Sequence, residues 1–96
     1  MPRPATFSTK EQRHYEDLEK ARPLRRLFRH VYGEPPLEYL LTLRVNYAKR
    51  LLRESPCLHY TVAQIATMSG FSDISYFSRI FKKRTGLSPR AYVQQA

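Results

Sequence analysis

The sequence is short of glycine, cysteine and long apolar runs, and each shortage excludes a class of protein. Three glycines in 96 residues leave few flexible positions, so the composition is that of a small, mostly helical globular domain. Cys57 is the only cysteine, which excludes an internal disulfide and favours a reducing compartment. No segment is apolar enough to span a membrane, and the first residues lack the apolar core of a signal peptide. We therefore expect a cytoplasmic protein without a membrane partner.

Arrangements typical of catalysis or metal binding are also missing. The three histidines, His14, His30 and His59, do not occur at metal-ligand spacing. No Ser/His/Asp or Cys/His combination suggests a nucleophile with its base, and no glycine-rich phosphate loop is found. We expect neither an enzyme nor a cofactor.

Acidic residues are few compared with basic ones. The chain holds 17 Lys and Arg against 8 Asp and Glu, a formal net charge of +9. Residues 1–54 contribute a net +5 and residues 55–96 a net +4, so the charge is spread along the chain. A small domain this basic fits an anionic polymer. A membrane surface is less suitable, because no helix combines a broad lysine-rich face with bulky apolar residues opposite.

Residues 61–89 carry the clearest functional pattern. Thr61 and Gln64 form a capping box that starts a first helix, and Gly70 suits the left-handed position at its end. A second helix restarts at Ser72, the predicted N-cap, with Asp73 in its first turn. Four residues lie on one face of the first helix: Val62, Ile65, Ala66 and Ser69. Two helices joined by so short a turn are typical of a helix-turn-helix, whose second helix enters the DNA major groove.

The second helix has an inner and an outer face. Phe77, Ile80 and Phe81 recur at helical spacing and should pack inward. The outer face carries Ser75, Ser78, Arg79 and Lys82, with Ile74 at its start. Short side chains allow the backbone to approach base edges, and Arg79 can then contact a guanine bidentately.

Three consecutive cations, Lys82, Lys83 and Arg84, end this helix. Read alone, they equally suit solubility and the negative end of the helix dipole. Behind a helix-turn-helix, contact with flanking phosphates is the preferred interpretation.

The N-terminal part of the chain predicts three further helices. Residues 8–21 form a polar helix, capped by Ser8 and Glu11 and broken at Arg22–Pro23. Residues 24–32 form a short helix ended by Gly33, with Leu24, Leu27, Phe28 and Val31 facing inward. Residues 37–54 form the longest helix, stopped by Ser55–Pro56. A last short helix follows Ser88–Pro89, and residues 1–7 should be disordered.

The chain contains an internal repeat with an offset of 53 residues. RRLFRHVYGEPPLEYL (residues 25–40) aligns without gaps on SRIFKKRTGLSPRAYV (residues 78–93). The identical pairs are Arg26/Arg79, Phe28/Phe81, Gly33/Gly86, Pro36/Pro89 and Tyr39/Tyr92. We interpret the repeat as a duplicated DNA-reading unit. The first copy is degenerate, because Gln12, Arg13 and Asp17 occupy the positions of Ile65, Ala66 and Gly70.

The motif GFSDISYFSRIFKKRTGLSPRAY, preceded by VAQIA and LRVNYAKRLL, closely resembles the DNA-binding domain of the AraC/XylS family of bacterial transcription regulators. The resemblance is good over residues 36–93 and extends to residues 23–35. It implies an all-α fold with two homeodomain-like helix-turn-helix subdomains joined by a long linker helix. The corresponding segments are a first, divergent unit at residues 8–35, a linker at 36–54 and a second unit at 55–96. Family members usually carry a separate effector-binding domain, so no small-molecule effector is expected on this segment.

Carried over by position, the resemblance places Ile74, Ser75, Ser78 and Arg79 toward bases of double-stranded DNA, with Tyr76 and Lys82 near its backbone. In the first unit it points to Arg22, Arg25, Arg26 and Arg29, which can bind phosphates. A helix over residues 37–54 spans about 27 Å, and neighbouring major-groove faces are about 34 Å apart, so two heads could occupy neighbouring grooves. The alternative function is an interaction module, whose first unit docks RNA polymerase or a partner domain while the second binds DNA.

Overall fold

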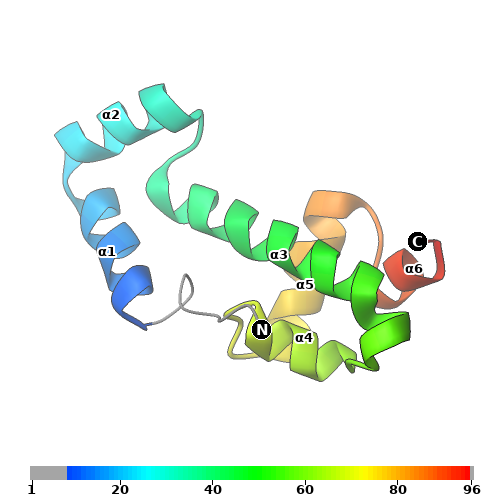
Figure 1. Cartoon of the computed structure of the whole chain (residues 1–96). Helices are drawn as coiled ribbons and strands as arrows, with labels where there is room; N and C mark the ends of the chain where they lie inside the picture. The colour runs from blue at the N-terminus through cyan, green and yellow to red at the C-terminus, as the bar shows by residue number, and fades with distance from the viewer. Residues whose placement is uncertain (1–8, 96) are drawn as a thin grey trace. The chain divides into compact units, whose positions relative to one another are not determined.

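Helices make up the regular structure of residues 9–95, which are the residues that the computed structural model describes. Within this range the chain forms helices and no strand, so the predicted all-α class is confirmed. The helices are α1 (Thr9–Lys20), α2 (Arg22–Tyr32), α3 (Pro36–Leu58), α4 (Val62–Met68), α5 (Ile74–Thr85) and α6 (Pro89–Gln95) (Figure 1). None of the helices described is long and apolar enough to cross a bilayer. The predicted disordered residues 1–7 and the predicted cap at Ser8 lie outside the described range.

The chain divides into two compact units within α3. The N-terminal half comprises residues 1–44 and the C-terminal half residues 45–96. The predicted boundaries at residues 35 and 54 stay a prediction.

The long helix α3 continues past the predicted stop at Ser55–Pro56. It runs to Leu58 with Pro56 inside it. Proline cannot donate the backbone hydrogen bond that the carbonyl of Leu52 would normally accept. The hydroxyl group of the buried Ser55 donates to this carbonyl instead, at 2.9 Å. The helix ends at Leu58, and the next residue, His59, adopts a positive φ of 59°.

In the N-terminal half, α1 packs on α2 through aromatic rings. The ring centroids of Tyr15 and Phe28 are 6.1 Å apart, and those of Phe28 and Tyr39 are 5.4 Å apart. The prediction that α2 turns its aliphatic residues inward is wrong, since Leu24, Leu27 and Val31 are 48%, 58% and 62% exposed. Helical periodicity identifies an apolar face, but it cannot supply an element to cover that face.

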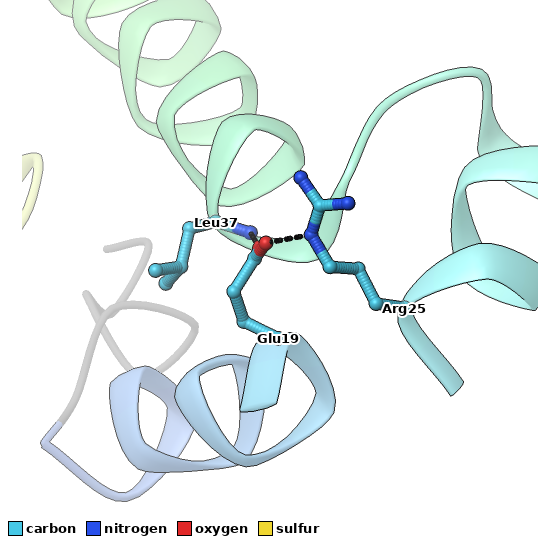
Figure 2. Close-up of polar contacts among 3 residues, drawn as sticks. All are labelled: Glu19, Arg25 and Leu37. Carbon is cyan, nitrogen blue, oxygen red and sulfur yellow. Dashed lines mark hydrogen bonds and ion pairs between the residues drawn. The ribbon is translucent and has the colours of Figure 1, made fainter. Parts of the chain in front are cut away.

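A carboxylate from α1 caps the start of α3. The backbone N–H of Leu37 donates to Glu19 Oε2 at 3.0 Å, and the Arg25 guanidinium pairs with Glu19 Oε1 (Figure 2). At the corresponding position of α6, Ser88 Oγ accepts the N–H of Ala91 at 3.1 Å. The residue of the first copy that aligns with Ser88 is Pro35, which has no side-chain acceptor. Glu19 therefore satisfies a free N–H of the first turn of α3.

This cap predicts that the N-terminal half is sensitive to acid. The hydrogen bond from the Leu37 N–H, together with Arg25, lowers the pKa of the Glu19 carboxyl below its ordinary value, although partial burial opposes the shift. A group with a lowered folded-state pKa stabilises the fold at pH values above its unfolded pKa, about 4.3 for glutamate. The contribution is lost as pH falls through the folded-state pKa.

We therefore expect Glu19→Gln to lower the stability of the N-terminal half at pH 7 and to flatten its pH dependence below about pH 4. The free energy of unfolding measured by urea denaturation across pH 2–7 tests this. Asp17→Asn, an exposed substitution on the same helix, is the control. An unchanged pH profile in Glu19→Gln would contradict the assigned cap.

The C-terminal half has a continuous apolar core. It is formed by Val45, Ala48, Leu51, Leu52, Ile65, Ala66, Phe71, Phe77 and Phe81, all at most 5% exposed. A hydrogen bond from Arg53 Nη1 to the hydroxyl group of Tyr92, at 2.9 Å, links α3 to α6 within this half. The predicted inward face of α5 is thus confirmed for Phe77 and Phe81, and Ile80 is half-buried.

The repeat found in the sequence has matching local structure in both copies. Phe81 and Tyr92 pack edge to face with centroids 5.4 Å apart, the same distance as for Phe28 and Tyr39. Gly33 and Gly86 end α2 and α5 with φ of 83° and 84°. The copies differ in what covers the helix, because Phe77 is 0% exposed whereas its counterpart Leu24 is not covered.

Candidate nucleic-acid interface

The first helix of the helix-turn-helix, α4, has a defined cap at each end. The Thr61 N–H donates to Gln64 Oε1 at 2.8 Å and the Gln64 N–H donates to Thr61 Oγ1 at 3.1 Å, which confirms the predicted capping box. At the other end, Gly70 has a φ of 89° and its N–H donates to the Thr67 carbonyl. The Phe71 N–H donates to the Ala66 carbonyl at 2.9 Å, which completes a Schellman motif.

The Schellman motif sets the path of the chain into α5. It directs Phe71 into the core, where the Phe71 ring lies 5.1 Å from that of Phe77. Helix α4 then packs against α5, with Ile65 and Ala66 buried. A rigid connection of this kind fixes the orientation in which α5 presents its outer face.

The N-cap of α5 is Asp73 and not the predicted Ser72. Asp73 Oδ1 accepts the N–H of Ser75 at 2.9 Å, and Asp73 has extended backbone angles. Ser72 and Asp73 are both good capping residues, so sequence preference alone could not separate them. The carboxylate of Asp73 is thereby engaged with the start of the helix.

We expect Asp73→Ala to destabilise the C-terminal half by about 1 kcal/mol, because a free N–H of the first turn loses its acceptor. Ser72→Ala, one residue earlier, should change stability by less than about 0.5 kcal/mol. Thermal unfolding followed by circular dichroism compares the two. A larger loss of stability in Ser72→Ala than in Asp73→Ala would mean that Ser72 is the N-cap of α5.

The outer face of α5 is open to solvent. Ser75, Arg79 and Lys82 are all exposed and follow one another at i, i+4 and i+7, which places them on one side of the helix. Ser78 is half-buried at the edge of this stripe, and Ile74 is exposed at the helix start. Of the residues that the sequence assigned to base contact, Ser75 and Arg79 thus share the exposed stripe, whereas Ser78 and Ile74 lie at its edges. Contact of these residues with bases stays a prediction.

The cations at the end of α5 do not all point the same way. Lys83 is exposed next to Lys82, whereas Arg84 is half-buried. At about 100° per residue, Arg84 is turned well away from Arg79. Of the three cations, Lys82 and Lys83 are the better placed to accompany Arg79 onto a surface.

Tyr76 has a neighbour that the sequence reading did not identify. The guanidinium carbon of Arg79 is 5.9 Å from the centroid of the Tyr76 ring. The spacing of three residues on a helix is a signal that could have indicated this contact. The tyrosine was assigned only to the DNA backbone.

On α2 the structure separates the four arginines of the first copy. Arg22, Arg26 and Arg29 are exposed, but Arg25 is half-buried and paired with Glu19. Arg22 and Arg26 line a shallow surface depression with Pro23, Leu27 and His30. His30 was missed by the sequence reading, although its position four residues after Arg26 could have indicated it. The exposed side chains of Arg22, Arg26 and Arg29 can bind a phosphate or another anion.

Comparison with known proteins agrees with this geometry. The family model described as a helix-turn-helix domain matches residues 20–95. The HTH-type transcriptional activator RhaR of Cronobacter sakazakii is 44% identical over 82 residues, which cover 85% of this chain and 27% of that protein. RhaR proteins of Yersinia pseudotuberculosis and Yersinia pestis are 39% identical over 74 residues, 77% of this chain and 24% of theirs. No solved structure matches the chain.

The chain thus spans about a quarter of the length of these relatives. The matched residues include α2 to α6, and with them the whole C-terminal helix-turn-helix. The chain therefore belongs to the AraC family and carries its helix-turn-helix DNA-binding domain.

Proposed function

We propose that this chain binds double-stranded DNA in a sequence-specific manner, with α5 in the major groove. The observation that carries the proposal is the exposed stripe of Ser75, Arg79 and Lys82 on a helix whose opposite face is anchored by Phe77 and Phe81. Short residues at the start of the stripe permit close approach, and the arginine supplies two parallel donors for guanine O6 and N7. Ile74 at the helix start can pack against a thymine methyl group.

The charge of the C-terminal half supports the same proposal. Residues 45–96 hold eight Lys and Arg against two acidic residues, Glu54 and Asp73. Asp73 is used as the helix cap, so the stripe contains no carboxylate that would oppose a phosphate. Lys82 and Lys83 are proposed to contact the DNA backbone, which positions α5 without reading sequence.

Arg22, Arg26 and Arg29 on α2 are proposed as a second backbone contact. Arg25 is less suited, because binding a phosphate would require it to leave Glu19. Since the relatives are transcriptional activators, we further propose that DNA binding by this chain regulates transcription.

Selection of duplexes from a random pool at near-physiological salt, followed by sequencing of the bound fraction, tests the proposal. Two enriched blocks about ten base pairs apart would assign base reading to both α2 and α5. One short block would assign it to α5 and leave α2 as a phosphate contact. Binding without any enrichment, lost as salt rises, would contradict sequence-specific binding by this chain.

A second candidate function is protein docking by the N-terminal half, with RNA polymerase or another domain as partner. The observation that favours it is the exposed apolar row of Leu24, Leu27 and Val31 on α2. A Leu27→Glu variant that still binds DNA but no longer supports activated transcription in a reconstituted reaction would support docking. Full activity of this variant would count against it.

A further inference from the structure

The contact between Tyr76 and Arg79 connects the outer face of α5 with the core of the C-terminal half. The Arg79 guanidinium carbon lies 5.9 Å from the Tyr76 ring centroid, within the range of a cation–π contact. The Tyr76 ring also lies 6.0 Å, centroid to centroid, from the ring of the buried Phe71. A continuous series of rings therefore leads from the core to the guanidinium group.

The local structure gives the tyrosine a fixed neighbour in the core, Phe71. Phe71 is fixed by the Schellman hydrogen bond to Ala66 and by its contact with Phe77. Tyr76 lies against Phe71 from the first turn of α5, with ring centroids 6.0 Å apart, and its side chain is 40% exposed. Within residues 9–95 the structure gives the Arg79 side chain no ion pair or hydrogen bond, which leaves the Tyr76 ring as the contact that can orient it.

We propose that Tyr76 is a positioning residue whose ring holds the Arg79 guanidinium group ready for a guanine. This inference rests on the proposed function, in which Arg79 reads a base. It differs from the sequence-based assignment, which gave Tyr76 a contact with the DNA backbone. A backbone contact would depend on the hydroxyl group of Tyr76, whereas the positioning of Arg79 depends on the face of the Tyr76 ring.

The physical reason is the flexibility of arginine. A free arginine side chain populates many rotamers, and immobilising it at an interface weakens binding. An arginine already held over an aromatic face loses less freedom when it meets the base. Because a random duplex offers a guanine at the required place only by chance, the gain should be largest at the cognate site.

Two substitutions separate the ring from the hydroxyl group. Tyr76→Phe keeps the ring and removes the hydroxyl group, while Tyr76→Leu keeps apolar bulk over Phe71 and removes the ring. For each variant, Kd is measured on the selected site and on the same site with 7-deazaguanine at the arginine-contacted position. This analogue lacks the N7 acceptor but still pairs with cytosine. The measured quantity is the Kd for the 7-deazaguanine site divided by the Kd for the selected site.

We expect Tyr76→Phe to keep the wild-type ratio and Tyr76→Leu to reduce it by about three- to tenfold, without changing Kd for random duplex. Arg79→Ala should bring the ratio to one. Adding Tyr76→Leu to Arg79→Ala should not weaken binding to the selected site any further. Equal weakening of cognate and random binding by Tyr76→Phe would instead assign the hydroxyl group to a phosphate. An undiminished ratio in Tyr76→Leu would overturn the positioning role alone.

The free protein provides a test that does not depend on DNA. Protons held over the face of an aromatic ring resonate upfield, so the Arg79 Hδ signals should lie upfield in the wild type and in Tyr76→Phe and should return to ordinary values in Tyr76→Leu. Ordinary values in the wild type would overturn the inference and leave the proposed function intact. A wild-type 7-deazaguanine ratio of one, with upfield Arg79 signals, would overturn base reading by Arg79 and hence any role of Tyr76 in it.

Discussion

Replacing Phe77 by alanine should lower the free energy of unfolding of the C-terminal half by about 3–5 kcal/mol. Phe77 is 0% exposed and contacts the rings of Phe71 and Phe81, so its truncation leaves a cavity that neighbouring side chains cannot fill. Small domains have only about 5–15 kcal/mol of stability in total. The variant should therefore lose a large part of its helical circular dichroism near 37 °C, and chemical denaturation measures the difference.

The internal repeat supplies a matched control, Leu24→Ala. Leu24 occupies the position of Phe77 in the first copy and is 48% exposed. Its truncation removes side-chain area that is already partly in water, so we expect a loss below about 1 kcal/mol. Comparable losses for the two variants would mean that α2 is covered as α5 is, in contradiction to the exposed apolar face.

The sequence predicted those features whose cause lies within a few residues. The capping box at Thr61, the left-handed Gly70 and the helix end at Gly33 were placed correctly, because each depends on local backbone chemistry. The repeat also had a structural basis, since the Phe28–Tyr39 and Phe81–Tyr92 pairs have the same centroid distance. Local signals were sufficient to identify the helix-turn-helix.

Features that depend on distant residues were not predictable. The cap of α3 comes from Glu19, 18 residues before the N–H that it accepts, and nothing near Leu37 indicates it. Helix α3 continues through Pro56 because the Ser55 hydroxyl group bonds the Leu52 carbonyl, a compensation that helix-breaking rules do not include. Similarly, Leu24 is exposed because, among the described residues, no helix covers the apolar face of α2.

The candidate site was predictable only in part, because it depends both on local spacing and on distant residues. Helical spacing was enough to group Ser75, Arg79 and Lys82, and the structure places them together. Spacing could not show that Arg25 is engaged by Glu19 or that Arg84 turns away from the stripe. The chemistry of a stripe can thus be read from sequence, whereas the availability of each side chain requires the packing around it.

Arg79→Ala should weaken binding to the cognate duplex by about 1–3 kcal/mol, roughly five- to 150-fold in Kd. Arg79 is exposed at the centre of the outer face of α5 and can donate two parallel hydrogen bonds to one guanine. Its loss removes discrimination at that single base pair, so selection with the variant should return the wild-type motif with one relaxed position. Titration of cognate duplex and of a duplex changed at that position measures the loss.

Lys82→Ala is the matched control, because Lys82 lies on the same face, three residues on, and is also exposed. As a proposed phosphate contact it releases counterions without reading sequence. We expect it to weaken all duplexes alike and to reduce the slope of log K against log salt by about one. If Arg79→Ala instead weakened cognate and random duplexes equally, Arg79 would join Lys82 as a backbone contact, and Ile74, Ser75 and Ser78 would remain as the candidates for base reading.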